Sequence, residues 1–300
     1  MDHPVLITGA TGTIGARVVE GLRSAGVPVR VATRHPGSTP ASAVDGARPD
    51  TALFDTVRFD FTDSDTWAAA FDGVRTAFIV RPPQVSNVRR DMIPALEAAR
   101  DAGVRHLVLL SLQGVEGAPF VPHAKLEAWM RESGLHWTFV RPSFFMENLT
   151  GVHASDVRDR DRIVVPAGRG RTSFVAAADV AAVAVAALAH PEAHLDRAWT
   201  PTGSEALTYS EVAEALSAAL GRDVAYARPG AWRYAAHARR VLGLPWAMVG
   251  VTTALYTVAR LGRAAGLTDD VMGATGVPPI TLAQWAAEHA AVWKREPTSS

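Results

Sequence analysis

The first half of the chain alternates short apolar runs with longer stretches in which apolar residues recur at helical spacing. Each run is apolar on both faces, which is typical of parallel strands that helices cover on both sides. The pattern therefore predicts an α/β fold with a Rossmann-type, doubly wound parallel sheet. We expect strands at Val5–Thr8, Val29–Thr33, Val57–Phe61, Ala77–Val80, His106–Leu110 and Trp137–Val140, and helices at Thr13–Ala25, Ile93–Arg100 and Lys125–Glu132.

The second half is less regular and predicts a smaller, mainly helical region on the carboxyl edge of the sheet. A helix rich in Ala and Val is expected to begin at Asp179. Two capping boxes, in which Thr precedes Glu or Gln by three positions, predict helices after Thr208 and Thr281. We expect residues 1–150 to form an NAD(P)-binding domain, and residues 151–300 to form a substrate-binding region that returns strands and helices to the sheet.

The stretch Val241–Ala259 is apolar and has no charged residue, so it has to be compared with a membrane-spanning helix. Gly243, Pro245 and Gly250 interrupt it, which lowers both its hydrophobicity and its helical continuity. We therefore expect no transmembrane span. An apolar helix that covers a substrate pocket or the seam of a dimer explains the stretch better, and the sequence leaves a monomer and a homodimer open.

Composition narrows the classes of function. The 300 residues are 48% hydrophobic, which is enough for a large core. Lys+Arg and Asp+Glu each number 30, so the formal net charge is zero and no overall positive field favours nucleic acid or an anionic membrane. The expected partner is a small apolar or aromatic substrate. Because the chain has no cysteine, disulfides, thiolate catalysis and cysteine-bound metal centres are excluded.

Location and metal binding follow from two further patterns. The first residues show no charged segment followed by an apolar run, so we expect no signal peptide and a cytoplasmic protein. His153, Asp156 and Asp159 lie close together in the sequence, but their spacing matches no known metal site. We therefore expect no metal.

A glycine-rich turn predicts a dinucleotide site between the first strand and the first helix. The segment Gly9–Gly15 has GxxGxxG spacing in the required context. The first glycine permits the tight turn, the second lets the backbone approach a pyrophosphate, and the third lets the helix pack on the strand. Backbone N–H groups at the start of the helix then bind phosphate. The expected cofactor-binding residues of the turn are Gly9, Thr11, Gly12, Thr13, Ile14 and Gly15.

The end of the second strand indicates which cofactor binds. An acidic residue there would bind the ribose 2′-hydroxyl, whereas an arginine would receive a 2′-phosphate. The residue is Arg34, and no Asp or Glu occurs from Pro28 to Ala43. We therefore expect NADP(H) to be preferred over NAD(H), which the site still admits. Asp60 and Phe61, at the end of the third predicted strand, are expected to flank the adenine.

Several later segments occur together in one known superfamily. Val80-Arg81-Pro82-Pro83 follows the fourth strand and Leu110-Ser111 follows the fifth. The stretch His123–Leu149 joins a helix containing His and Glu to the sequence RPSFFMENL. With the glycine turn, these segments resemble the atypical short-chain dehydrogenase/reductase superfamily, and within it the NmrA-like and NAD(P)H:quinone-oxidoreductase-like proteins. The resemblance covers most of the chain.

The resemblance implies that the nicotinamide ring lies near the ends of the later strands. The superfamily usually has Tyr-x-x-x-Lys at this site, and Lys125 fits the lysine, but Val121 stands where the tyrosine would be. The missing phenol weakens the case for ordinary carbonyl reduction. The residues that the resemblance adds to the cofactor site are Val80, Arg81, Lys125, Pro142, Ser143 and Phe144.

Three polar residues are the candidates for catalysis. Lys125 is expected to bind ribose hydroxyls or to act as a general acid. His123 is an alternative proton donor, because an unperturbed imidazole titrates near neutral pH, although a lone histidine is often structural. Ser111 either polarises a carbonyl by hydrogen bonding or is an ordinary turn residue. Glu127 lies on the same helical face as His123, so it either orients His123 or is solvated.

These expectations combine into a reductase that moves hydride from NADP(H) to a quinone, an enone or a similar conjugated carbonyl. Such acceptors delocalise the arriving charge, which suits a site without the tyrosine. Two alternatives stay open. One is a non-catalytic, NmrA-like regulator that senses NADP(H), and the other is a non-redox cyclase or isomerase of secondary metabolism on the same scaffold.

Overall fold

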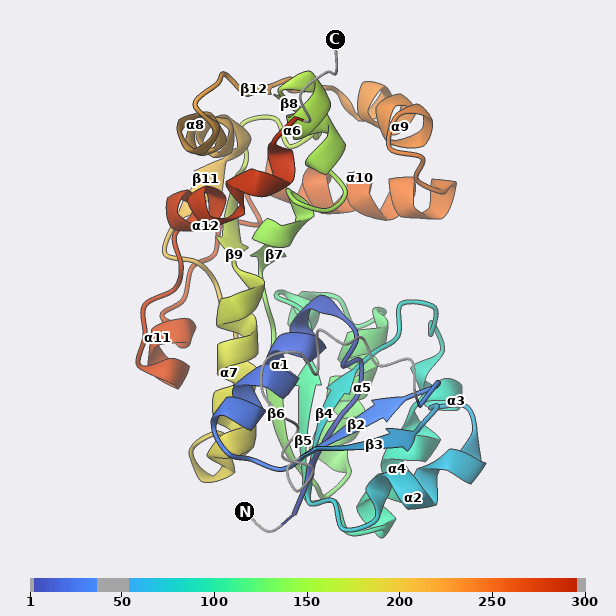
Figure 1. Cartoon of the computed structure of the whole chain (residues 1–300). Helices are drawn as coiled ribbons and strands as arrows, with labels where there is room; N and C mark the ends of the chain where they lie inside the picture. Colours follow the sequence, from blue (N-terminus) through green and yellow to red (C-terminus); the bar gives the residue numbers. More distant parts are fainter. Residues whose placement is uncertain (1–2, 37–53, 296–300) are drawn as a thin grey trace. The chain divides into compact units, whose positions relative to one another are not determined.

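The computed structural model describes residues 3–36 and 54–295 of the chain (Figure 1). The chain divides into two compact units, which are described separately. Unit 1 comprises Met1–Pro142, Ala177–Pro201 and Asp270–Val277, and unit 2 comprises Ser143–Ala176, Thr202–Asp269 and Pro278–Ser300. The polypeptide first leaves unit 1 after Pro142 and returns to it twice. The assignment of cofactor binding to residues 1–150 and of substrate binding to residues 151–300 stays a prediction.

Unit 1 is built on one seven-stranded sheet with the order β10-β6-β5-β4-β1-β2-β3. Every neighbouring pair is parallel, so the predicted doubly wound α/β fold is confirmed. The central strands are buried on both faces, as the uninterrupted apolar runs predicted. The strands are β1 (Val5–Ile7), β2 (Val29–Thr33), β3 (Phe54–Arg58), β4 (Thr76–Val80), β5 (His106–Leu110), β6 (His136–Val140) and β10 (Arg197–Trp199).

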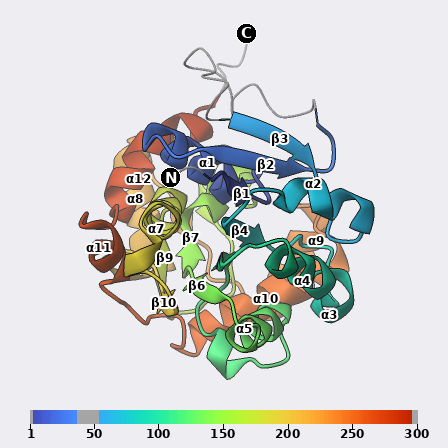
Figure 2. The same ribbon diagram turned by 90° about the horizontal axis from the view of Figure 1, so that it is seen from below.

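Helices cover both faces of this sheet (Figure 2). The helices α1 and α7 lie on one face, where they pack against each other, and α2, α3, α4 and α5 lie on the other. Short 3₁₀ turns join several of these elements. The helices of unit 1 are α1 (Thr13–Ser24), α2 (Trp67–Phe71), α3 (Val88–Asp91), α4 (Ile93–Asp101), α5 (Pro122–Glu132), α7 (Ala177–Ala189) and α11 (Asp270–Thr275).

Two strand predictions need correction. The third strand ends at Arg58, so the predicted range Val57–Phe61 lies too far along the chain. Its apolar residues Phe59 and Phe61 are buried in the core with Phe71, and they made the segment after the strand resemble the strand itself. A strand returning from the second half was expected, but the position of this seventh strand, β10, was not predicted. It is three residues long and has two exposed positions, so it leaves almost no hydrophobic pattern.

Unit 2 combines two small sheets with five helices. One sheet has the order β11-β9-β7, and the other pairs β12 with β8. Both predicted capping boxes are confirmed at Thr208 and Thr281. The strands are β7 (Phe144–Phe145), β8 (Arg162–Ile163), β9 (Arg171–Val175), β11 (Ala206–Thr208) and β12 (Ala225–Tyr226). The helices are α6 (Ala154–Arg160), α8 (Tyr209–Leu220), α9 (Ala231–Arg240), α10 (Trp246–Arg260) and α12 (Leu282–His289).

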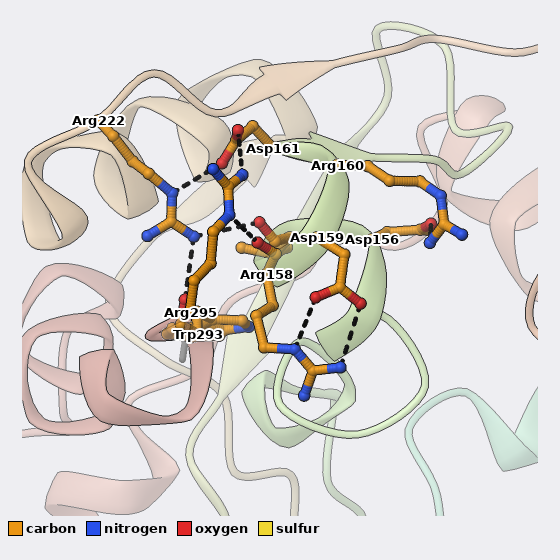
Figure 3. Close-up of polar contacts among 9 residues, drawn as sticks. Asp156, Arg158, Asp159, Arg160, Asp161, Arg222, Trp293 and Arg295 are labelled. Carbon is orange, nitrogen blue, oxygen red and sulfur yellow. Dashed lines mark hydrogen bonds and ion pairs between the residues drawn. The ribbon is translucent and has the colours of Figure 1, made fainter. Parts of the chain in front are cut away.

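A cluster of ion pairs fastens the C-terminal segment of unit 2 (Figure 3). Asp161 ends α6 in the left-handed conformation, and its carboxylate accepts hydrogen bonds from Arg222 and Arg295. Arg222 also donates to the carbonyl oxygen of Trp293 at 3.0 Å, and Arg295 donates to that of Arg158 at 2.7 Å. The end of α6, the loop after α8 and the C-terminal segment are thereby held together.

The apolar stretch Val241–Ala259 is interrupted around Gly243 and Pro245, as predicted, whereas Gly250 lies inside a continuous helix. The helix α9 ends at Arg240, and α10 begins at Trp246 directly after Pro245, which serves as its N-cap. Within residues 3–36 and 54–295, no helix is long and apolar enough to span a membrane.

Candidate functional site

The chain reverses its strand order between β4 and β1, and ligands of open parallel sheets bind at such a switch point, beyond the carboxyl ends of the strands. Gly9 lies just after β1, and Arg34, Arg81 and Ser111 directly follow β2, β4 and β5. Because the strands are parallel, these residues lie at one edge of the sheet. The structure therefore brings most of the predicted cofactor residues of unit 1 together.

The glycine turn has the shape that a dinucleotide requires. Gly9 has a φ of +66°, and a Cβ at this position would lie 3.0 Å from Cβ of Val80. A Cβ at Gly15 would lie 2.2 Å from the carbonyl oxygen of Gly9, so no side chain fits there. The helix α1 begins at Thr13 with no side-chain cap, which leaves its first N–H groups directed at the turn. The residues present therefore fit a bound pyrophosphate.

Two charged residues, Arg34 and Asp60, lie just after the ends of β2 and β3. Arg34 is exposed at the end of β2. The Asp60 carboxylate accepts hydrogen bonds from the backbone N–H of Thr62 at 2.8 Å and from its hydroxyl at 2.7 Å. Partial burial opposes ionisation, but these bonds and the charges of Arg34 and Arg58 hold the pKa of Asp60 below its usual value. Asp60 is therefore an anion, set between two arginines.

Phe61 occupies a different place from the one its predicted role suggests. Its ring is buried and packs edge-on against Phe59, with the ring centres 4.8 Å apart. The ring belongs to the core beneath the sheet edge. Contact of Phe61 with adenine stays a prediction.

Arg81 and His123 face each other across the edge of the sheet. The Arg81 Nε donates toward His123 Nε2 at 3.5 Å, and its Nη1 donates to the carbonyl oxygens of Pro82 and Val85. Burial, with the nearby charge of Arg81, lowers the pKa of His123 to about 4, and the charge of Glu127 opposes this only in part. His123 is thus neutral near pH 7, and its hydrogen is on Nδ1 because Nε2 accepts from Arg81.

Ser111 is tied to a buried ion pair. Its hydroxyl donates to Oε1 of Glu127 at 2.7 Å. Glu127 is 1% exposed and accepts two further hydrogen bonds from Arg141, from Nε at 2.9 Å and from Nη2 at 2.6 Å. Arg131 adds a fourth at 3.2 Å. The two oxygens of Glu127 are therefore saturated, so it is not solvated, and its hydrogen bonds go to Ser111, Arg141 and Arg131 instead of His123.

Arg141 and Glu116 complete this network, and neither was predicted. Arg141 is 6% exposed and bonds to Glu116 as well as to Glu127. Burial alone would lower the pKa of Arg141, but its bonds to Glu127 and the two carboxylate charges raise it. The sequence did contain one signal for Arg141, because an arginine that directly follows an apolar strand is expected to be buried, and a buried charge needs a partner of opposite charge. A cavity of about 410 Å³ opens beside the network and is lined by Val115, Glu116, Pro119, Ala124, Glu127 and Arg131.

Lys125 lies apart from these groups. On α5 it is exposed, as are Ala128 and Glu132 on the same stripe, whereas Leu126 and Met130 are buried. No polar contact within the described ranges fixes the ammonium group. Its role at the ribose stays a prediction.

The remaining predicted cofactor residues divide between the units. Pro142 is the last residue of the first segment of unit 1, and Ser143 and Phe144 belong to unit 2. The hydroxyl of Ser143 is buried and has no hydrogen-bond partner among the described residues, which is unusual for a buried donor. Phe144 packs in unit 2 against Phe174 and Tyr256, with ring centres 5.8 and 5.7 Å away.

The residues weighed as metal ligands have other partners. His153 Nε2 lies 2.5 Å from the hydroxyl of Tyr256, and Asp156 pairs with His237 at 2.7 Å. Asp159 pairs with Arg158 at 2.8 Å. Figure 3 shows the Asp159 and Asp156 carboxylates turned toward these arginine-rich surroundings instead of toward each other.

Comparison with known proteins points to one family. The sequence model of the NmrA-like family matches residues 1–231. Among curated relatives, an NAD(P)H azoreductase of Xenophilus azovorans is 36% identical over 96% of this chain and 99% of its own. The resemblance that the sequence predicted is thereby confirmed.

Solved structures with the same fold include two that contain the phosphorylated cofactor. The triphenylmethane reductase of Citrobacter sp., complexed with NADP(H), has a TM-score of 0.82 at 22% identity and covers 96% of this chain and 99% of its own. An NADPH-dependent quinone oxidoreductase of Escherichia coli, complexed with NADPH, has a TM-score of 0.81 at 24% identity and covers 95% and 99%. At these identities the likeness shows the fold.

Proposed function

The chain belongs to the NmrA-like family, and we propose that it is a reductase that uses NADP(H) to reduce a quinone, an enone or a related conjugated carbonyl in the cytoplasm. The observation that carries the proposal is the glycine turn at the switch point, where Gly9 and Gly15 leave no room for side chains. The relative named NAD(P)H azoreductase, matched over almost its whole length, supports oxidoreductase chemistry.

The proposed preference for NADP(H) rests on charge. Arg34 is exposed at the end of β2, and a second arginine, Arg58, lies near enough to Asp60 to lower its pKa, although its guanidinium pairs with Asp63 at 2.9 Å. A 2′-phosphate is bound well by guanidinium groups. NAD(H) lacks that phosphate, so we expect it to bind more weakly.

Ser111 is proposed to bind the cofactor as a hydrogen-bond acceptor. A serine hydroxyl has one hydrogen, and that of Ser111 is donated to Glu127. It therefore has none left to polarise a substrate carbonyl, but its oxygen can accept from an amide or hydroxyl group of the nucleotide. Glu127, held by Arg141, acts as a positioning residue that fixes this state of Ser111.

His123 is proposed to donate a hydrogen bond from Nδ1 to the oxygen of the acceptor. NADPH, when bound, supplies the hydride. A neutral imidazole is a weak acid, so His123 stabilises the developing oxyanion without transferring a proton to it, and solvent supplies the proton afterwards. This weak assistance suffices for a conjugated acceptor, because the acceptor delocalises the charge. Lys125 is proposed to bind ribose hydroxyls once the cofactor is present.

The two alternative functions can be separated by turnover. The regulator is supported by Val121, which replaces the phenol of the usual active site. A regulator would bind NADP(H) and consume none of it, and a cyclase or isomerase would convert its substrate without net oxidation of NADPH.

The test is anaerobic oxidation of NADPH, followed by its near-ultraviolet absorbance, with a panel of quinones, enones and azo compounds. Binding of NADPH and NADH is titrated in parallel. We expect tighter binding of NADPH, turnover with at least one acceptor, and slower turnover in Lys125→Ala. Tight binding without oxidation of NADPH by any acceptor would overturn the proposal.

A further inference from the structure

The segment 224–268 in unit 2 carries a strong local charge. It contains six arginines and no Asp, Glu or Lys, in a chain whose formal net charge is zero. All six are exposed, and within the part of the chain that the structure describes none forms an ion pair. They are Arg228, Arg233, Arg239, Arg240, Arg260 and Arg263.

Four other arginines of unit 2 behave differently. Arg158, Arg160, Arg222 and Arg295 all bond to aspartates in the cluster around α6 (Figure 3). The absence of acidic residues therefore distinguishes the segment 224–268, because exposed arginines without an ion pair also occur at Arg162 and Arg169 among the described residues. The six positive charges have no acidic residue within their own segment.

The same segment exposes a large apolar surface. The helices α9 and α10 pack together (Figure 1), and α10 turns Val249, Tyr256 and Ala259 toward the core of unit 2. From Trp246 to Ala259 the helix has no charged residue, and its exposed side is apolar except for Thr257. Trp232 on α9 is 90% exposed and Trp246 is 65% exposed. We call these residues, with the exposed Met248, Val251, Leu255, Val258 and Leu261 and the six arginines, the α9–α10 surface.

We propose that the α9–α10 surface docks on an anionic lipid bilayer. A helix with one apolar face, flanked by arginines and tryptophans, lies in the plane of a bilayer with its apolar side at the boundary of the headgroups. Tryptophan is enriched at that depth, and arginine binds lipid phosphate and anionic headgroups. An anionic bilayer thus suits both kinds of group, because its apolar layer can contact the apolar side chains and its negative headgroups can bind the arginines.

A second copy of the chain fits the surface less well. A two-fold symmetric dimer would place this surface against itself. Arginines of the segment would then come near those of the other copy, with no carboxylate in residues 224–268 to balance them. Like charges facing each other across an interface are strongly unfavourable. A soluble polyanion would satisfy the arginines but leave the tryptophans and α10 in water.

The experiment is co-sedimentation of the full chain with vesicles of phosphatidylcholine containing about 30% phosphatidylglycerol, and with vesicles of phosphatidylcholine alone. We expect binding to the anionic vesicles only, weakening as salt is added. The double variant Arg240→Gln/Arg263→Gln should bind roughly 25-fold more weakly, because each basic residue near an anionic surface contributes about fivefold. Trp232→Ser should also weaken binding.

Two controls keep the result interpretable. Arg89→Gln/Arg162→Gln removes two exposed arginines outside the surface and should bind as the unchanged protein does. Thermal unfolding of every variant should match that of the parent, because the substituted side chains are exposed. Turnover of NADPH in solution does not depend on docking, so this proposal and the proposed reductase activity fail separately.

Three outcomes would overturn the proposal. The first is no binding to anionic vesicles at low salt, and the second is equal binding to both kinds of vesicle. The third is a concentration-dependent dimer without lipid that Val251→Glu abolishes, because a second copy would then cover the surface.

Discussion

The polar residues at the carboxyl edge of the sheet are held in defined hydrogen-bonding states. Glu127 accepts hydrogen bonds from four donors, and one of these is the hydroxyl of Ser111, which has no second hydrogen to donate. His123 is neutral beside Arg81. These states decide what each residue can do for a ligand. They were not predictable, because the sequence gives the residue types at the edge but not which donor meets which acceptor.

Gly15→Ala tests the fit of the glycine turn. The added Cβ would lie 2.2 Å from the carbonyl oxygen of Gly9 and 2.7 Å from its carbon, so the turn has to move. We expect NADPH binding to weaken by at least tenfold, or about 1.4 kcal/mol, in a calorimetric titration. Gly117→Ala is the control, since its Cβ would meet nothing within 4 Å. Equal affinities of the two variants would place the nucleotide elsewhere.

Ser111→Ala tests the acceptor role of the serine. Glu127 keeps three other donors, so stability should change little. We expect the KM for NADPH to rise by roughly fivefold to tenfold, as the loss of one hydrogen bond of about 1 kcal/mol implies, while kcat changes less. Ser133→Ala, outside the network, should leave both constants unchanged. A fall in kcat at an unchanged KM would instead show that Ser111 assists the substrate carbonyl.

At the scale of elements, local patterns predicted most of unit 1. The apolar runs gave the positions of the central strands, and the glycine turn gave the start of α1. The third strand was misplaced because Phe59 and Phe61 pack in the core although they follow the strand and do not belong to it. Strand β10 was missed because it joins the sheet next to β6 only after a long excursion of the chain.

The capping box of α8 provides a test at this scale. The hydroxyl of Thr208 accepts from the backbone N–H of Glu211, and the carboxylate of Glu211 accepts from the backbone N–H of Thr208 at 2.7 Å. Thr208→Ala should lower the free energy of unfolding by about 1 kcal/mol in urea titrations. Thr208→Ser keeps the acceptor and should lose only a few tenths. Equal losses would mean that the methyl group, and not the cap, matters.

At the scale of the whole molecule, the sequence predicted a boundary near residue 150 and returns to the sheet, but not which later segments return. Each unit is assembled from segments that are distant along the chain, and periodicity reports only on neighbouring residues. The sequence did identify Val241–Ala259, which contains most of α10, as an unusual apolar segment. It could not show that α10 leaves one apolar side exposed, since that depends on how the helix packs.

Stability should fall in mild acid because unit 1 and unit 2 each bury a neutral histidine. Burial lowers the pKa of His106 and of His153 to about 4, and an unfolded histidine titrates near 6.5. Between these values the unfolded chain binds more protons, so stability is full above about pH 6.5 and is lost as the pH falls toward 4. Each histidine contributes on the order of 3 kcal/mol to the free energy of unfolding above this pH range.

Urea unfolding at a series of pH values measures this loss. His106→Asn should reduce the slope of stability against pH, and the exposed His190→Asn should not. A free energy of unfolding that stays constant from about pH 7 to 4 would contradict the neutral state of both histidines.

The central claim is that the nicotinamide hydride reaches an organic acceptor bound to this chain. The most direct test mixes the protein, without oxygen, with stoichiometric NADPH deuterated at the transferred position and an acceptor from the panel, and analyses the product by mass spectrometry. Our account predicts deuterium in the reduced acceptor and slower oxidation of the deuterated NADPH. Product without deuterium, or NADPH that stays reduced while the acceptor is converted, would contradict it.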